Sequence, residues 1–358
     1  MLNRAAKLIV GLFFLGVGTT ACAAADYYVS TKGSDAGQGS QHTPWASLTR
    51  AATSVQPGDT VHVAPGVYAT PATTTASGTS SARIRFISDV QWGAVIATKG
   101  AYTSWKNEGD YVDIMGFDIS GDGSLGLLNM GSHVRIVGNK VHDVPVVDCT
   151  KNGGAGIMNG NYSAGDNDII ANIVSNIGSR ARHCPRVHGI YHANRGGHIW
   201  NNISSGNEGW GIHLWHAANA VVVANNLAFE NGEGGIKVGA GDSPGGVVAD
   251  NMVVSNNILL RNTRAIAERG DTGPNNLYSN NVIYANVRGL ILVHGKERGT
   301  ISADPKLLDS RPTALKPQSG TPMGAPPLDI EGRPRPSGSP PEIGPFESGT
   351  QAKPWPWM

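Results

Sequence analysis

Tyr191, His213 and Lys237 each directly follow a Gly-Ile pair, at intervals of 22 and 24 residues. A phenol, an imidazole and an amine can between them donate a proton, accept one and hold negative charge. β-Elimination from a uronic acid polymer needs all three actions. A base removes the proton next to the sugar carboxylate, a donor holds the developing charge, and an acid protonates the leaving oxygen. We predict that His213 or Lys237 is the base and that Tyr191 is the acid.

The same stretch of chain contains other side chains that suit a sugar acid. Arg195 is the candidate partner for the carboxylate, and Trp215 could stack on a sugar ring with little loss of entropy. Any single histidine here could instead be a solvated surface residue, or a buried one satisfied by hydrogen bonds. The concentration of such side chains between residues 188 and 237 is what favours a site. The remaining candidate substrate-binding residues are His188, His192, Asn194, His216 and Arg269.

Two interleaved sequence patterns indicate how these residues are positioned. In the first, an apolar or small residue leads to a recurring Asn, at Asn139, Asn172, Asn202, Asn226, Asn257 and Asn281. In the second, a small residue precedes an aliphatic one, at Ile157, Ile190, Ile212, Ile236, Ile266 and Leu290. These aliphatic positions are 33, 22, 24, 30 and 24 residues apart, as expected of a solenoid with loops of varying length. The repeats are rich in Gly, Asn, Val and Ile and lack helical periodicity, so we predict an all-β fold of β-helix coils.

The repeated positions have physical reasons. Asn tolerates the left-handed backbone of a tight bend, and its amide can bond to the same residue in the neighbouring coil. Because coils lie roughly 4.8 Å apart, matching aliphatic side chains stack inward as one core. Strand alternation then turns the next residue outward. The predicted outward column is Met158, Tyr191, His213, Lys237, Ala267 and Ile291.

Loops are expected on both sides of this column. The interval from the Asn to the aliphatic residue is 18 residues in the first two coils and 9 or 10 in the later four, so the extra residues form outward loops. Cys149 and Cys184 fall in these two loops, and we predict a disulfide between them. The Gly-rich segment 239–246 forms a loop on the other side of the column.

The beginning of the chain is typical of an exported protein. Basic residues precede an apolar run over 8–17, and small residues at 23–25 allow cleavage. We predict a signal peptide over 1–25 and a secreted or periplasmic protein. Cys22 could instead be lipidated, which would make an outer-membrane lipoprotein, although Thr19 is a poor residue three places before such a site. The apolar run is too short to span a membrane.

Composition excludes some classes of partner and cofactor. With 28 basic and 27 acidic residues, the chain has no charge bias that would suit nucleic acid or a membrane surface. We expect a monomer that requires no cofactor. A calcium ion could assist if Asp242 or Glu233 gathered further oxygen ligands, but no calcium-loop pattern is present and the metal is left open. Glycoside hydrolysis needs two carboxylates, and the outward column contains none.

The chain divides into three segments after the signal peptide. Residues 26–100 form an N-terminal cap and the first coils, with a short helix over 47–55 that could cover the open end. The repeats occupy 101–300. Residues 301–358 are rich in Pro and Gly without periodicity, and we predict that this tail lies along the coils and covers their other end.

Blocks at both ends of the mature chain carry a family resemblance. The opening blocks Tyr27-Tyr-Val-Ser30, Gly33-Ser-Asp35, Pro44-Trp45 and Pro65-Gly-Val-Tyr68 resemble the N-terminal region of secreted polysaccharide lyase-like (pectin lyase-like) proteins, including relatives of chondroitinase B and alginate lyase. The tail blocks Ala303-Asp-Pro305, Asp329-Ile-Glu-Gly-Arg333 and Glu342-Ile-Gly-Pro-Phe-Glu347 are similar to the ending common in that superfamily. The resemblance implies a right-handed parallel β-helix.

The resemblance also bears on activity. Chondroitinase B relatives use a Lys and an Arg on one face, for which Lys237 with Arg195 or Arg269 are the counterparts here. The acidic metal-binding residues that accompany that pair are not found in this chain. A lyase acting on an acidic polysaccharide is our first hypothesis. A glycan-binding or surface structural protein, an epimerase and a glycoside hydrolase are the alternatives.

Overall fold

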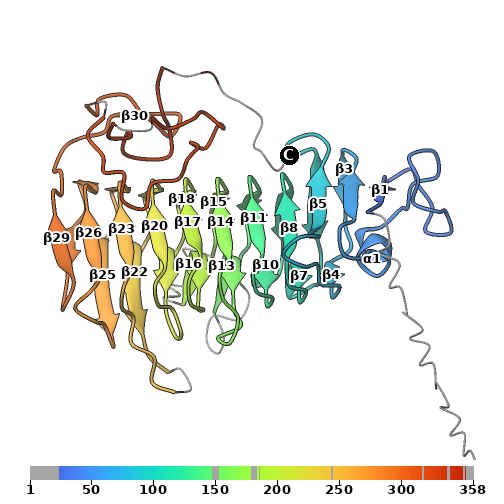
Figure 1. The fold of residues 1–358 in the computed structure, drawn as a ribbon, viewed down its shortest axis with the longest axis horizontal. Coiled ribbons are helices and arrows are strands. Elements are labelled where there is room, and N and C mark those ends of the chain that lie inside the picture. The colour runs from blue at the N-terminus through green and yellow to red at the C-terminus, as the bar shows by residue number, and fades with distance from the viewer. Residues whose placement is uncertain are drawn as a thin grey trace, which may run out of the picture.

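The computed structural model describes residues 24–146, 153–178, 184, 186–242, 245–316, 318–336, 339–349 and 351. Most of the predicted signal peptide, Cys22 and Cys149 therefore lie outside the described residues. The described chain forms an elongated solenoid of three long parallel sheets, which confirms the predicted all-β architecture (Figure 1). No helix among these residues has the length and apolarity needed to cross a membrane.

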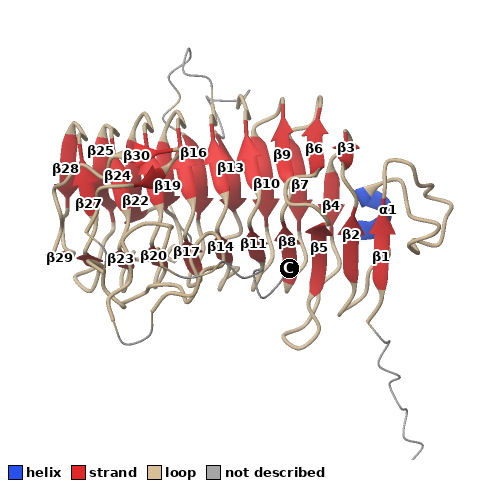
Figure 2. Ribbon diagram, turned by 90° about the horizontal axis from the view of Figure 1, so that it is seen from above, coloured by secondary structure: helices blue, strands red, loops and turns tan. Residues whose placement is uncertain are grey.

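Each coil passes through one strand of each sheet in turn, and successive coils pair in parallel (Figure 2). The first sheet consists of β1 (Asp26–Val29), β2 (Thr60–Val63), β5 (Ile84–Ser88), β8 (Val112–Met115), β11 (Arg135–Val137), β14 (Asp168–Ile170), β17 (His198–Trp200), β20 (Val222–Ala224), β23 (Val253–Ser255), β26 (Leu277–Ser279) and β29 (Lys296–Arg298). The second consists of β3 (Gly66–Tyr68), β6 (Ala94–Thr98), β9 (Asp118–Gly121), β12 (Lys140–His142), β15 (Ile173–Ser175), β18 (Ile203–Ser205), β21 (Leu227–Phe229), β24 (Ile258–Leu260) and β27 (Val282–Tyr284). The third consists of β4 (Ala72–Thr74), β7 (Thr103–Asn107), β10 (Leu125–Asn129), β13 (Gly154–Asn159), β16 (Val187–His192), β19 (Trp210–Leu214), β22 (Gly234–Ala240), β25 (Arg264–Gly270) and β28 (Arg288–Ile291).

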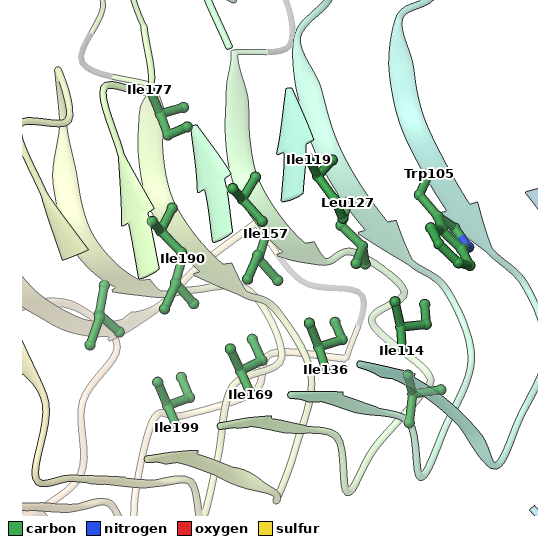
Figure 3. Close-up of a cluster of buried hydrophobic side chains, with 14 of the residues drawn as sticks. Trp105, Ile114, Ile119, Leu127, Ile136, Ile157, Ile169, Ile177, Ile190 and Ile199 are labelled. Atoms are coloured by element: carbon green, nitrogen blue, oxygen red, sulfur yellow. The ribbon is translucent and has the colours of Figure 1, made fainter. Parts of the chain in front are cut away.

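The core is built from columns of aliphatic side chains stacked along the solenoid (Figure 3). In the third sheet, Leu127, Ile157 and Ile190 pair in register and are fully buried. In the first sheet, Ile136 and Ile169 pair in the same way. Complete burial of such a side chain contributes about 1.5–3 kcal/mol. The inward aliphatic column predicted from the repeats is therefore confirmed.

In each Asn-Asn pair of the repeats, one residue forms the bend and the other forms the inward hydrogen-bond ladder. The first Asn has the left-handed backbone, with φ of 55° at Asn201 and 57° at Asn225. The second faces inward, where Asn202 Nδ2 donates to Asn226 Oδ1 at 3.0 Å. The same bond joins successive members of the series Asn139, Asn172, Asn202, Asn226, Asn257 and Asn281. The predicted ladder exists, but the bend belongs to the residue before each ladder Asn.

The C-terminal segment lies along the coils (Figure 1), and left-handed Asn residues bond to it there. Asn201 Nδ2 donates to the Leu328 carbonyl at 2.7 Å. Asn225 Nδ2 donates to the carbonyls of Glu342 and Gly344 at 2.9 and 3.0 Å. This segment, which contains the short antiparallel strands β30 (Leu307–Leu308) and β31 (Arg311–Pro312), thus lies along the solenoid as predicted.

The two ends of the solenoid differ in how they are covered. At the N-terminal end, α1 (Leu48–Ala52) buries apolar side chains beside β1 and β4, and Ser47 Oγ accepts from the backbone N–H of Arg50. At the other end, all three residues of β29 are exposed. Coverage of this end by the tail stays a prediction: Ile301 pairs with Val282 of β27, the last strand of the second sheet, and later tail residues bond to the side of the coils.

Candidate active site

The third sheet presents the outward column that the repeats predict. Met158 pairs with Tyr191, Tyr191 with His213, and His213 with Lys237 in successive coils. Lys237 in turn pairs with Ala267. Neighbouring members are about one strand spacing, roughly 4.8 Å, apart.

A local break in strand alternation adds His188 to this face. A Cβ atom at Gly189 would clash with Ser204 Oγ inside the coil, so Gly189 faces inward, and the next residue, Ile190, is also fully buried. Two successive inward residues leave both His188 and Tyr191 on the outer face, while the pairing with β13 and β19 stays one to one. Their rings are stacked, with centroids 5.4 Å apart and an interplanar angle of 13°.

The outer face of the third sheet contains a pocket of about 710 Å³. Six of the predicted site residues line it: His188, Tyr191, His213, Trp215, His216 and Lys237. The other described lining residues are Tyr102, Leu125, Leu128, Met130, Gly153, Gly154, Ala155, Met158, Gly160, Tyr162, Arg186 and Asp242.

His188 and His213 form a hydrogen-bonded pair in this pocket, with 2.7 Å between His188 Nε2 and His213 Nδ1. The backbone N–H of Trp210 donates to His188 Nδ1 at 3.4 Å, so this nitrogen acts as an acceptor. A neutral His188 must then carry its proton on Nε2 and donate to His213. Neutral His213 carries its own proton on Nε2, which is buried and has no hydrogen-bond partner among the described residues.

Burial keeps both imidazoles uncharged. It lowers the pKa of His188 to about 3, assisted by the positive charge of Lys237. It also holds the pKa of His213 well below its usual value, together with His188 and Lys237. His213 is therefore a neutral N–H donor rather than a strong base.

Lys237 is the group whose proton affinity suits a base near neutral pH. Its Nζ atom lies 4.1 Å from the centre of the Trp215 ring. Partial burial, assisted by the nearby charge of Arg269, lowers the pKa of Lys237 to about 8. A Cβ atom at Gly239 would lie 2.6 Å from Trp215 Cζ3, so this strand needs a glycine to accommodate the ring.

Tyr191 lies between the histidine pair and the rest of the pocket. Its ring makes an edge contact with His213, with centroids 5.0 Å apart. Burial, then the neighbouring Tyr162 and Asp242, raise the pKa of Tyr191 well above its usual value. The Tyr191 phenol is therefore protonated. It can donate a hydrogen bond or a proton, but it does not act as a base.

Four predicted site residues lie elsewhere. His192 is fully buried, and its Nδ1 lies 3.0 Å from Asn159 Nδ2, which places it in an inward polar ladder with Asn129. Asn194 is also fully buried. These positions correct the expectation that the two side chains contact substrate, because neither reaches the surface.

The two remaining arginines do not line the pocket. Arg195 is exposed beyond the end of β16 and forms a backbone bridge with Gly165 of the preceding coil. Arg269 pairs with Gly239 in the coil after Lys237, and its charge contributes to the lowered pKa of Lys237. Arg195 as the carboxylate partner and Arg269 as a substrate contact stay predictions.

The loops supply lining residues that the column pattern did not reveal. Arg186 belongs to the insertion before Ile190, and Asp242 to the Gly-rich loop after Lys237. Tyr162 follows β13 and stacks on His216, with ring centroids 4.3 Å apart. The sequence predicted loops on both sides of the column, and this was the available sign of such residues. Residue spacing does not show which side chain of a loop faces the pocket. The Cys149–Cys184 disulfide remains a prediction, because Cys149 is outside the described residues.

The donor set does not fit a calcium site built from protein carboxylates. Glu233 is paired with Arg264 at 2.8 Å, and Asp242 is the one carboxylate among the described lining residues. No group of three His, Cys, Asp or Glu side chains that could hold a metal ion occurs in the described chain. No step below passes through a metal ion.

Comparison with known proteins identifies the family. A family model described as the Pel9A-like right-handed β-helix region matches residues 27–290. The chain belongs to this family. The Pel9A-like assignment confirms the right-handed parallel β-helix and the pectin lyase-like superfamily expected from the terminal blocks.

Solved structures with the same fold as this Pel9A-like chain include several carbohydrate-active proteins. Pectate lyase Pel9A has 16% identity and a TM-score of 0.61, covering 91% of this chain and 96% of that one. XylC in complex with xylose has 14% identity and a TM-score of 0.56, covering 77% and 67%. A rhamnogalacturonan lyase has 16% identity and a TM-score of 0.51, covering 78% and 85%. Identities this low show a shared fold only. No curated protein sequence matches the chain.

Proposed function

We propose that this Pel9A-like protein is an exported polysaccharide lyase that cleaves an acidic, uronic acid-containing polymer by β-elimination. The observation that carries the proposal is Lys237, a partly buried amine with its pKa lowered to about 8, in an open pocket beside two neutral histidines and a protonated phenol. Enzymes that abstract a weakly acidic proton tune a lysine in this direction.

Each part of the reaction has a candidate group. The neutral amine of Lys237 takes the proton from the sugar carbon next to the carboxylate, and the electron pair of that C–H bond forms the new ring double bond. The bond to the glycosidic oxygen breaks, and the Tyr191 hydroxyl gives that oxygen a proton. The excess proton on Lys237 then returns to Tyr191 through solvent, which restores both groups.

The developing negative charge on the carboxylate needs donors that do not compete for the proton. We assign this role to His213 Nε2–H, because the pair with His188 fixes its proton there and this buried atom has no protein partner among the described residues, in a side chain that lines the pocket. Arg186, which lines the pocket, takes the role first expected of Arg195. The lowered pKa of His213, together with the hydrogen bond of its Nδ1 to His188, favours Lys237 as the proposed base.

Aromatic side chains around these groups suit sugar rings. Trp215 beneath Lys237 and the stacked pair of Tyr162 and His216 present flat apolar surface to the pocket. Hydrolysis is less well supported, since a second carboxylate opposite Asp242 is missing from the described lining. An epimerase would share the first proton abstraction, and a binding protein would need none of the pKa shifts.

The test is absorbance of the unsaturated uronide product while the purified protein is incubated with acidic polysaccharides. We expect absorbance to rise with wild type and not with Lys237→Ala. Exchange of the sugar proton with heavy water, without any rise in absorbance, would identify an epimerase. A flat trace without exchange, together with retained binding, would assign the protein to the glycan-binding class.

A further inference from the structure

The pocket is chemically divided along the solenoid axis. At one end, its histidines, Tyr191, Lys237 and Asp242 come from β16, β19, β22 and their loops. At the other end, β10 and β13 and the turns after them supply an apolar surface. We call this surface the apolar floor, and it consists of Leu125, Leu128, Met130, Ala155 and Met158.

Three side chains of the apolar floor converge around one glycine. A Cβ atom at Gly160 would lie 3.1 Å from Leu128 Cδ1, 3.1 Å from Met158 Cε and 3.5 Å from Met130 Sδ. Leu128, Met130 and Met158 are each partly exposed, so they remain available to a ligand. Two thioethers and an isobutyl group form an adaptable surface for small apolar groups.

The apolar floor is part of the same pocket as the proposed reacting groups. Leu128, Met158, Tyr191, His213 and Lys237 are consecutive members of one outward column. Four strand spacings therefore separate Leu128 from Lys237, about 19 Å. A polymer with one sugar at Lys237 would extend its neighbouring units over the apolar floor.

An unsubstituted polyuronate fits this surface poorly. Each of its units would bring a carboxylate against methyl and thioether groups, and desolvation of an unpaired charge is costly. The next member of the column, Lys106, does not relieve this cost, because its Nζ already pairs with Glu108 at 2.5 Å. Among the described lining residues, the cation Lys237 belongs to the other end, and Arg186 lies beside Gly153 and Gly154, at the opposite end of β13 from Gly160.

We infer that the apolar floor is a subsite for methyl-terminated substituents on the sugar units beside the one that is cleaved. Methyl esters, O-acetyl groups and the methyl group of a 6-deoxy sugar share this chemistry. The ligand assignment rests on the proposed function, whereas the apolar floor itself is independent of it. Burial of one such group is expected to raise kcat/KM by at least about tenfold.

The experiment compares polymers with and without methyl-terminated groups; the acetylated and esterified polymers share a backbone with their parent, and rhamnogalacturonan, whose backbone itself contains the 6-deoxy sugar, is compared with polygalacturonate. Initial elimination rates are measured on polygalacturonate and alginate, on the O-acetylated form of each, on partly methyl-esterified polygalacturonate and on rhamnogalacturonan. These arms distinguish the three sources of the methyl group. We expect one substituted class to exceed its unsubstituted parent by about tenfold or more.

Side-chain variants of the apolar floor show whether a rate difference between polymers comes from binding at this surface or from the intrinsic reactivity of the modified sugar. Met158→Gln keeps the length of the side chain and should bring the ratio of substituted to unsubstituted rates close to one, as should Leu128→Gln. Met323→Gln is the matched control, because Met323 is 47% exposed in the C-terminal segment and does not line the pocket. A ratio that survives in both floor variants would overturn the subsite.

The failure of the subsite is distinguishable from the failure of the proposed function. Equal rates on substituted and unsubstituted polymers would overturn the subsite and leave the lyase intact. If no polymer is cleaved, calorimetric titration of the same panel decides: tighter binding of substituted polymers that is lost in Met158→Gln supports the subsite, and equal or absent binding overturns it.

Discussion

His188 Nε2 and His213 Nδ1 lie 2.7 Å apart, and this bond decides which nitrogen of His213 carries the proton. His188 is 5% exposed, so it acts through its neighbour. We expect His188→Leu to reduce kcat about tenfold or more with a smaller change in KM, because His213 loses the donor that fixes its tautomer. His188→Gln should recover part of the rate, since its amide can also donate to His213. A stability defect alone would not be relieved by this second variant.

Lys237→Arg tests the base directly. Arginine keeps the positive charge but stays protonated at any working pH, so elimination should fall at least about 100-fold. Lys106→Arg is the control, because Lys106 is in the same outward column but is paired with Glu108. Activity retained in Lys237→Arg would rule out this lysine as the base, and binding measurements would show whether the substrate still docks.

The pH dependence of elimination should report the lowered pKa of Lys237. Below about pH 8 most molecules carry the ammonium form, which cannot accept a proton. The rate kcat/KM should therefore rise about tenfold per pH unit as pH approaches 8 from below, and level off above it. A profile that instead levels off near pH 6 would point to a histidine with an ordinary pKa.

Stability should depend on His192, which is buried without charge and has its pKa lowered to about 4. In the unfolded chain its pKa is near 6.5, so the unfolded state binds more protons between these values. The free energy of unfolding should then fall as pH drops from about 6.5 towards 4, by up to about 1.4 kcal/mol per pH unit from this group. His192→Asn should remove this contribution, since Asn continues the ladder of Asn129 and Asn159. The exposed His42 offers a control, His42→Asn, whose urea unfolding should match wild type at each pH.

Asn225→Gly should loosen the C-terminal segment without straining the coil. Glycine accepts the left-handed φ of 57°, but it removes the two bonds to the carbonyls of Glu342 and Gly344. The expected loss is about 1–3 kcal/mol, with faster proteolysis after residue 301. Asn251→Gly is the matched control, because Asn251 has the same φ of 57° and is exposed. Equal protease resistance in both variants would contradict the anchoring role.

The repeats predicted the solenoid and its register because identical positions recur every coil and each has a single physical explanation. The outward column of Tyr191, His213 and Lys237 followed from alternation after a buried aliphatic residue. His192 was misplaced because the prediction relied on proximity in sequence, although the same alternation turns it inward. The position of Arg195 could not be predicted for a different reason: it lies past the strand, where periodicity carries no information. The contacts of His188 depend on two successive inward residues, Gly189 and Ile190, which only three-dimensional packing reveals.

The side chains of Asn201 and Asn225 bond to residues of the C-terminal segment that are 117 to 134 positions away in sequence. A stack of coils has only nearest-neighbour contacts and could otherwise open from its exposed end one coil at a time. Because this segment is bonded to several coils, those coils open together rather than one at a time. It also sets an order of assembly, since its binding surface exists only after the coils have formed. A segment that follows the coils in sequence thus completes their folding, and a product truncated before this segment would lack that stabilisation.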